Sequence, residues 1–290
     1  MKLKLRRHRG KPRAARSFIG NTANFVFLCI FGAVMVLPMV YSIVNAFKPL
    51  DELFIYPPRF YVKNPTLNNF KGIVALFNDT QVPFSRYLSN TLLITIFGTA
   101  GGIFIASGAG YVLEKKNFPC KNGIFKMITL ALLFTGGVTA IPSFLVISKL
   151  GILDTYWSIF LPSWAGSMGV FLMKQFMENV PNTLLEAARI DGAGENKIFW
   201  TIVMPSVKSA WMTLIIFSFQ SYWGQTGGGT IFSEELKTLP YALSQVLAAG
   251  ISRSGESAAI SMLMMLVPIA VFVITQSNVM ETMMSSGIKE

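Results

Sequence analysis

Charged residues are scarce in this chain of 290 residues. Asp, Glu, Lys and Arg make up 13% of the sequence, about half of the ~25% found in soluble domains. Each of six segments lacks charge and is near or above the ~20 residues that a helix needs to cross a bilayer. These segments are 24–47, 91–113, 127–148, 155–173, 209–233 and 257–280. We therefore expect an all-α integral membrane protein with six transmembrane helices.

The absence of charge from these segments disfavours several functions. A charge at mid-bilayer costs at least ~2.5–3.5 kcal/mol and is usually functional where it occurs. A proton relay, a voltage sensor and an ion-coupled carrier all depend on such groups. The single histidine, His8, lies in the basic N-terminal tail, and no acidic pair or metal cluster faces the predicted membrane. A membrane enzyme is therefore disfavoured, as is a self-sufficient channel, because nothing resembles a filter or gate ring.

Cysteine is nearly absent too. Cys29 lies within the first predicted span and Cys120 in a loop, so the two differ too much in depth to pair. A cleavable signal peptide is also not expected. The apolar run 25–44 is longer than the ~7–15 residues of a signal's apolar region and has no convincing cleavage site. We interpret this run as an uncleaved first span.

Positive charge is distributed unevenly between the two sides of the membrane. With six spans, both termini share one side with the loops 114–126 and 174–208. That side holds 17 of the 25 Lys and Arg residues, whereas the acidic residues divide equally. The positive-inside rule places this side in the cytoplasm. Topology thus explains the net charge of +11 without nucleic-acid binding.

This topology divides the chain into a basic cytoplasmic tail, 1–23, and a transmembrane domain, 24–290. The expected extracytoplasmic segments are 48–86, 149–155 and 224–256. The first of them is rich in proline and asparagine, which indicates a turn-rich lid.

The second predicted span carries a stripe of small residues, each four positions after the last. Residues four apart share a helix face, and small side chains there allow two helix backbones to approach closely. The stripe therefore predicts tight helix packing. It consists of Gly98, Gly102, Ala106 and Gly110.

A polar segment, 178–206, joins the fourth and fifth predicted spans. Thr183 and Glu186 fit a capping box in which the Thr183 hydroxyl caps a short helix. Gly192 would end that helix, because glycine tolerates the left-handed conformation of a helix stop. A second helix then carries Phe199 to the membrane-side core. From the residues alone, such a knob suits either docking into a partner or an ordinary helical connection.

The residue spacing in this segment resembles the EAA loop of ABC-importer permeases. Glu-Ala-Ala, two residues and Asp-Gly-Ala are followed at fixed distances by Phe, Ile and Pro. Met204 stands where leucine is usual, which is a volume-conserving exchange. The coupling residues that the resemblance assigns are Glu186, Ala187, Ala188, Arg189, Asp191, Gly192, Ala193, Phe199, Ile202 and Pro205.

Other stretches resemble the smaller permease subunit of maltose-like and multiple-sugar importers. They are 47–48, 52–54, 65–70, 90–92 and 287–290. The outward segment 224–256 departs from this pattern, being rich in glycine where relatives are usually more apolar. The resemblance otherwise covers nearly the whole chain.

The resemblance implies the type I ABC-importer permease fold and a place in the bacterial plasma (inner) membrane. The chain would be a transport subunit rather than an enzyme, importing a sugar or oligosaccharide by ATP-driven alternating access. It contains no Gly-x-x-x-x-Gly-Lys-Ser/Thr motif, so ATP and Mg are expected on partner chains. Those partners would be two ATP-binding cassette subunits, a second homologous permease forming a heterodimer, and an extracytoplasmic solute-binding protein. The alternative is a permease for an amino acid, a peptide or phosphate.

Within the loop, the resemblance implies a division of roles. Glu186 would contact the ATPase by charge, the three alanines would fill its groove, and Gly192 would preserve the bend.

The fifth predicted span offers polar and aromatic residues for a substrate path. Aromatic faces stack on sugar rings while amides and hydroxyls bind sugar hydroxyls. The competing interpretation is an aromatic belt at the membrane interface. The candidate residues are Ser218, Gln220, Ser221, Tyr222 and Trp223.

Overall fold

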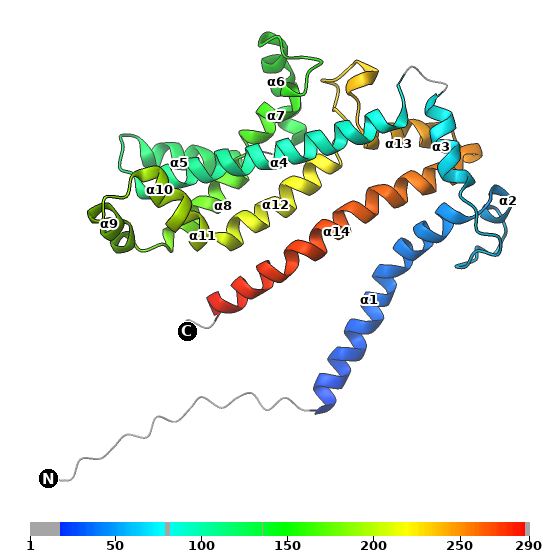
Figure 1. Cartoon of the computed structure of the whole chain (residues 1–290), viewed down its shortest axis with the longest axis horizontal. Helices are drawn as coiled ribbons and strands as arrows, with labels where there is room; N and C mark the ends of the chain where they lie inside the picture. The colour runs from blue at the N-terminus through cyan, green and yellow to red at the C-terminus, as the bar shows by residue number, and fades with distance from the viewer. Residues whose placement is uncertain (1–17, 79–81, 135, 288–290) are drawn as a thin grey trace.

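The described chain consists of helices and their connections, which confirms the predicted all-α class (Figure 1). The computed structural model describes residues 18–78, 82–134 and 136–287. The first half contains α1 (Phe18–Phe47), α2 (Leu50–Leu53), α3 (Asn68–Asn78), α4 (Phe84–Lys115), α5 (Lys121–Ala131) and α6 (Gly136–Lys149). The second half contains α7 (Trp157–Trp164), α8 (Ser167–Glu178), α9 (Asn182–Ile190), α10 (Glu195–Ile198), a π-helical turn (Phe199–Val203), α11 (Met204–Ser206), α12 (Lys208–Trp223), α13 (Leu239–Ala248) and α14 (Ser254–Gly287).

Helix α4 packs closely against α7, α8 and α12 through its small residues. A Cβ added at Gly98 would lie 2.6 Å from the ring of Tyr222 on α12, and one at Gly110 would lie 2.8 Å from the Cβ of Met173 on α8. Gly101 leaves room for the indole of Trp164 on α7, whereas a Cβ at its neighbour Gly102 would make only an ordinary contact. Hence Gly101, which lies outside the predicted stripe, is the glycine required beside Trp164.

The predicted count of six spans is not confirmed. Helices α1, α4 and α14 are long and apolar enough to cross a membrane. Two bent pairs, α5 with α6 and the stretch 195–206 with α12, bring the possible total to five if each pair is one span. The predicted continuous spans 127–148 and 155–173 are wrong, because each is divided between two helices, α5 with α6 and α7 with α8. In the second case, Ala165 and Gly166 lie at the break, where the conformational freedom of glycine disfavours helix continuation.

The predicted fifth span, 209–233, extends too far. Helix α12 ends at Trp223, and Gly227, Gly228 and Gly229 follow with φ values of 91°, 49° and 80°. A run of left-handed residues cannot continue a right-handed helix, so the chain turns back toward α13.

Lys48 and Asn69, in the stretches that resemble sugar permeases, connect the end of α1 to α3 and to the segment that follows α2. The buried Lys48 ammonium donates to the Oδ1 of Asn45 at 3.0 Å and to the carbonyl of Arg59. The Asn69 side chain donates to the carbonyls of Ala46 and Lys48 at 2.9 and 2.8 Å. These contacts give Lys48 and Asn69 a structural role. They lie at the end of the molecule where Figure 1 shows α2 and α3. The predicted turn-rich lid accordingly contains the helices α2 and α3.

Helix α1 leaves the other helices toward its N-terminal end (Figure 1). Residues 20–38 are all exposed, and Phe25, Leu28 and Met35 are among the exposed apolar side chains. This surface is suited to lipid or to another membrane protein. Cys29 lies on it and Cys120 precedes α5; both are free thiols, as predicted.

Replacement of Gly110 by alanine tests the close packing of α4. We expect Gly110→Ala to destabilise the protein by about 1–3 kcal/mol, because its methyl would meet backbone atoms of Met173 and Lys174. Gly108→Ala is the matched control, since a Cβ there has no atom within 4 Å. Thermal unfolding in detergent measures both variants. Equal melting temperatures would contradict the packing of α4 on α8.

Candidate functional site

The polar segment 178–206 begins with α9, and its start differs from the prediction. The helix begins at Asn182, after Pro181 at the cap position, and no side chain caps it. Thr183 therefore lies inside the first turn, and the predicted capping box is wrong. Pro181 fixes the entry instead, because its restricted φ is compatible with a helix start and its carbonyl accepts from the Leu184 amide at 3.2 Å.

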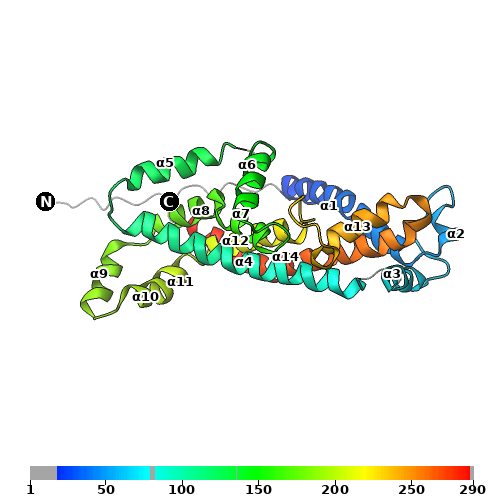
Figure 2. The same cartoon turned by 90° about the horizontal axis from the view of Figure 1, so that it is seen from above.

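The end of α9 agrees with the prediction. Gly192 has φ of 80°, and the Ala193 amide donates to the carbonyl of Ala188 at 2.9 Å, which closes the helix. A second helical stretch then runs through α10, the π-helical turn and α11, and meets α12 at a bend of 80°. Figure 2 shows α9 and α5 on opposite sides of the end of α4.

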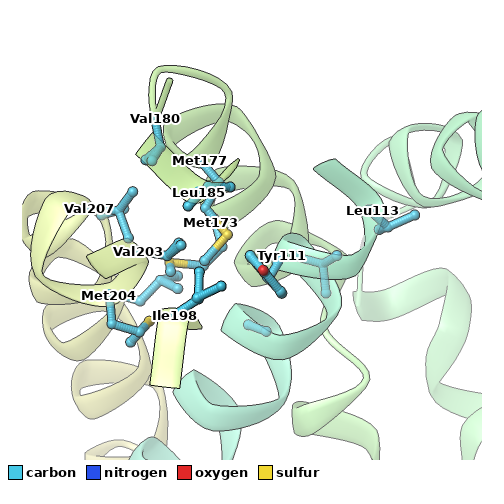
Figure 3. Close-up of a cluster of buried hydrophobic side chains, with 14 residues drawn as sticks. Tyr111, Leu113, Met173, Met177, Val180, Leu185, Ile198, Val203, Met204 and Val207 are labelled. Atoms are coloured by element: carbon cyan, nitrogen blue, oxygen red, sulfur yellow. The ribbon is translucent and has the colours of Figure 1, made fainter. Parts of the chain in front are cut away.

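The base of the segment is anchored in a buried apolar cluster (Figure 3). Leu185 of α9 is 2% exposed, and Ile198 is fully buried among residues of α4 and α8. Phe199 and Ile202 pack against this cluster, which confirms the anchoring predicted for them. Figure 3 labels Tyr111, Leu113, Met173, Met177, Val180, Leu185, Ile198, Val203, Met204 and Val207.

Most side chains of α9 other than Leu185 are exposed. Glu186, Ala187 and Arg189 are among them, together with two apolar residues that the sequence analysis omitted, Leu184 at 47% and Ile190 at 86% exposure. The signal for these two residues was available in the sequence. Leu184 and Ile190 flank Glu-Ala-Ala on a short helix, and Leu185 already supplies the side chain that packs in the core. The exposed surface therefore combines charge with uncovered apolar area.

The remaining predicted loop residues divide between surface and core. Asp191, Gly192 and Pro205 are exposed. Ala188 and Ala193, assigned to a partner's groove, are only half-exposed and pack partly against the chain's own cluster. Of the three alanines, Ala187 alone is fully available to a partner.

A network of charges joins this segment to the end of α4. The Glu195 carboxylate lies 2.6 Å from the Lys116 ammonium and 3.1 Å from the Nε of Arg189, and accepts a hydrogen bond from the Tyr111 hydroxyl at 2.7 Å. Hydrogen bonds from Lys116 and Tyr111 lower the pKa of Glu195 to about 2. Glu195 is therefore ionised at physiological pH. Sequence reasoning missed it because its partners are 79 to 84 residues away or across the glycine turn.

The neighbouring residues at the end of α4 make further contacts with the same region. Lys115 donates to the carbonyl of Val180 at 2.6 Å and to the Oδ1 of Asn182 at 3.2 Å. Glu114 forms an ion pair with Lys174 of α8 at 3.0 Å. Glu114, Lys115 and Lys116 at the end of α4 thus contact α8, the start of α9 and the start of α10, respectively.

A cavity of about 230 Å³ lies among α4, α7, α8 and α12. Three of the predicted path residues, Ser218, Ser221 and Tyr222, line it, and Ser163 and Trp164 of α7 contribute to the opposite side. Tyr222 is 5% exposed, and its hydroxyl has no hydrogen-bond partner among the described residues by geometry. No charged residue of the described chain lines this cavity. Its polar groups are therefore neutral hydroxyls beside aromatic rings.

The other two predicted path residues face away from this cavity. Gln220 lines a separate cavity with Pro268 and Phe272 of α14. Trp223, 3% exposed, donates its Nε1–H to the carbonyl of Met264 at 2.8 Å. Helical periodicity explains the division, because residues 218, 221 and 222 share a face that residues 220 and 223 do not. Tyr222 and Trp223 are both buried within the chain, which favours packing roles over a lipid-facing aromatic belt.

The fold is that of a membrane permease of ABC transporters. The chain resembles a chain in the crystal structure of a bacterial ABC transporter involved in the import of the acidic polysaccharide alginate, with a TM-score of 0.76. The match covers 93% of this chain and 99% of that chain at 23% identity, so the likeness concerns the fold.

Family membership follows from the sequence itself. Residues 24–282 match the family of binding-protein-dependent transport system inner membrane components, and the chain belongs to this family. It is 32% identical over 216 residues to protein LplC of Bacillus subtilis (strain 168), covering 73% of this chain and 68% of LplC. It is 30% identical over 197 residues to the polygalacturonan/rhamnogalacturonan transport system permease protein YtcP of the same organism, covering 68% of this chain and 66% of YtcP. The class predicted from the EAA loop is confirmed.

Truncation of the two leucines of α9 separates its anchoring from its exposed surface. We expect Leu185→Ala to destabilise the protein by about 2–5 kcal/mol, because it opens a cavity in the core. Leu184→Ala, at the adjacent exposed position, is expected to change stability by no more than ~0.5 kcal/mol. Thermal unfolding of the purified protein in detergent distinguishes the two. A similar loss in both variants would show that Leu185 is not the anchor.

Proposed function

We propose that this chain is the transmembrane permease subunit of an ABC importer that moves a sugar or oligosaccharide into the cytoplasm. Transport would proceed by ATP-driven alternating access, with ATP hydrolysed by separate subunits. The observation that carries the proposal is α9, which presents the Glu-Ala-Ala motif on an exposed surface while its base is fixed in the core. A rigid helix of this kind can transmit a partner's movement instead of absorbing it.

The proposed topology has six membrane crossings in the bacterial inner membrane. The broken pairs α5–α6 and α7–α8 would account for the third and fourth crossings, and α12 for the fifth. The N- and C-termini and the coupling loop, residues 178–206, would lie in the cytoplasm, with the basic tail 1–23 beside the inner leaflet. The excess of Lys and Arg on that side supports this orientation.

The proposed partners are a second, different permease, two ATP-binding cassette subunits and an extracytoplasmic solute-binding protein. ATP and Mg would be held by the cassette subunits, and this chain would bind no cofactor. The family's dependence on binding proteins supports the last partner, as does a solved complex of the alginate transporter with an alginate pentasaccharide-bound periplasmic protein, which this chain resembles with a TM-score of 0.54. The exposed apolar surface of α1 offers contact area for the second permease.

In the proposed mechanism, ATP closes the cassette dimer and draws the two coupling loops together. Glu186 would interact with the cassette by charge, and Leu184, Ala187 and Ile190 would supply apolar contact. The two permeases would then rock between inward- and outward-facing states around the substrate path. Gly192 would keep α9 at its angle, because its positive φ suits no other common residue as well.

The cargo assignment is supported by the chemistry of the cavity. Neutral hydroxyls and an indole face a space among four helices, a combination that suits the hydroxyls and C–H faces of a sugar. The relative YtcP is named for polygalacturonan and rhamnogalacturonan transport, which favours an oligosaccharide. A charged cargo such as phosphate is the alternative, for which the second permease would have to supply the countercharge.

Substitutions in the coupling loop test the function directly. We expect Glu186→Lys and Gly192→Pro to abolish ATP-dependent uptake, the first by reversing a charge at the cassette surface and the second by forbidding the positive φ. Both variants should still insert into the membrane. Asn122→Ala, at an exposed position in α5, serves as the control. Uptake at the normal rate by both loop variants would contradict the coupling role.

Reconstituted complexes test the cargo. Labelled oligogalacturonides, arabino-oligosaccharides and inorganic phosphate are offered to proteoliposomes containing the complex and its binding protein. We expect uptake of an oligosaccharide. In Tyr222→Phe the uptake rate should fall by up to about tenfold, because the hydrogen bond from the hydroxyl to the cargo is removed. Uptake of phosphate alone would establish the alternative cargo. Unchanged uptake in Tyr222→Phe and Ser218→Ala would place the path outside this cavity.

A further inference from the structure

Two routes connect the coupling loop to the cavity. The first follows the chain from α10 through the π-helical turn and α11 to α12, and it crosses a bend of 80°. The second passes through space from the loop to α4, by the contacts of Glu195 and Lys115. When a partner displaces α9, the first route predicts that α12 moves, and the second route predicts that α4 moves.

The second route consists of direct side-chain contacts between the loop and the end of α4. Glu195, at the start of α10, contacts both α9 and the end of α4, because Arg189 lies in the last turn of α9, Tyr111 lies in the last turns of α4, and Lys116 directly follows α4. The Tyr111 ring also packs on that of Phe199, with centroids 5.3 Å apart. Charge-assisted hydrogen bonds of this kind are about twice as strong as neutral ones.

Helix α4 leads directly from this network to the cavity. It runs without interruption from Phe84 to Lys115, and Gly102, Ile103 and Ala106 line the cavity. A displacement at its cytoplasmic end is therefore delivered to the cavity wall by one continuous helix. The route through α12 has no such continuity.

We propose that Glu195 is a positioning residue that joins the coupling loop to α4, so that movement of α9 reaches the cavity through α4. The inference rests on the proposed coupling function of the loop. It assigns to Glu195 a role in transmission rather than in docking of the ATPase. Position 195 should accordingly tolerate another carboxylate, as in Glu195→Asp, but not the loss of its charge.

The test follows α4 with a reporter cysteine in the assembled complex. Ile103→Cys is introduced after replacement of Cys29 and Cys120 by serine, and its labelling by N-ethylmaleimide is compared without nucleotide and with ATP, Mg and vanadate. We expect a severalfold change in labelling rate with Glu195 intact. Glu195→Gln should remove most of this change while the ATPase still co-purifies. Glu195→Asp, which keeps the carboxylate facing Lys116, Arg189 and Tyr111, should retain most of it.

Glu235→Gln is the matched control, because Glu235 is an exposed carboxylate outside the coupling loop; it should leave the nucleotide response intact. A full response in Glu195→Gln, or no response in the reporter with Glu195 intact, would overturn the inference. Loss of the ATPase from the Glu195→Gln complex would also overturn it, in favour of a docking role. Failure of the unmodified complex to contain an ATPase would instead refute the proposed function.

Discussion

The close approach of three helices to α4 is the constraint on which the rest of the structure depends. Gly98, Gly101 and Gly110 leave space for Tyr222, Trp164 and Met173, and larger residues would force these neighbours away. The cavity exists because the aromatic side chains of α7 and α12 are held against α4 on either side of it. The same helix ends in the charged residues that hold the coupling loop. One helix thus positions both candidate sites.

The two sites differ in chemistry as their proposed tasks require. The cavity has neutral hydroxyls and aromatic faces, which suit an uncharged, hydroxyl-rich cargo that must bind and leave. The loop has an exposed mixture of charge and apolar side chains on a helix with a buried base, which suits a lasting protein contact. The ion pairs of Glu195 join Arg189 of α9 to Lys116 after α4, and they leave Leu184, Glu186, Ala187 and Ile190 exposed.

The sequence was most informative where local chemistry decides the structure. The glycine stop at Gly192 and the anchoring of Phe199 were predictable, because positive φ and apolar spacing are local signals. The broken spans were not, since composition alone does not reveal whether residues such as Gly166 end a helix or pack inside it. The capping box failed because Pro181, not Thr183, is the cap residue, so the helix starts two residues earlier than predicted. Glu195 was missed because its partners on α4 are close only in the folded chain. The predicted path residues point into different surroundings because composition does not show which helix face each residue occupies.

A distance measurement across the coupling loop and α4 tests the central claim that they move as one body. Spin labels are placed at Ile190 of α9 and at the exposed Phe97 of α4, in a complex whose two native cysteines are replaced by serine. The account predicts the same distance between these labels without nucleotide and with ATP trapped by vanadate, while a label at Phe272 of α14 changes its distance from Ile190. A shift in the Ile190–Phe97 distance on trapping would contradict it, because α9 would then move independently of α4.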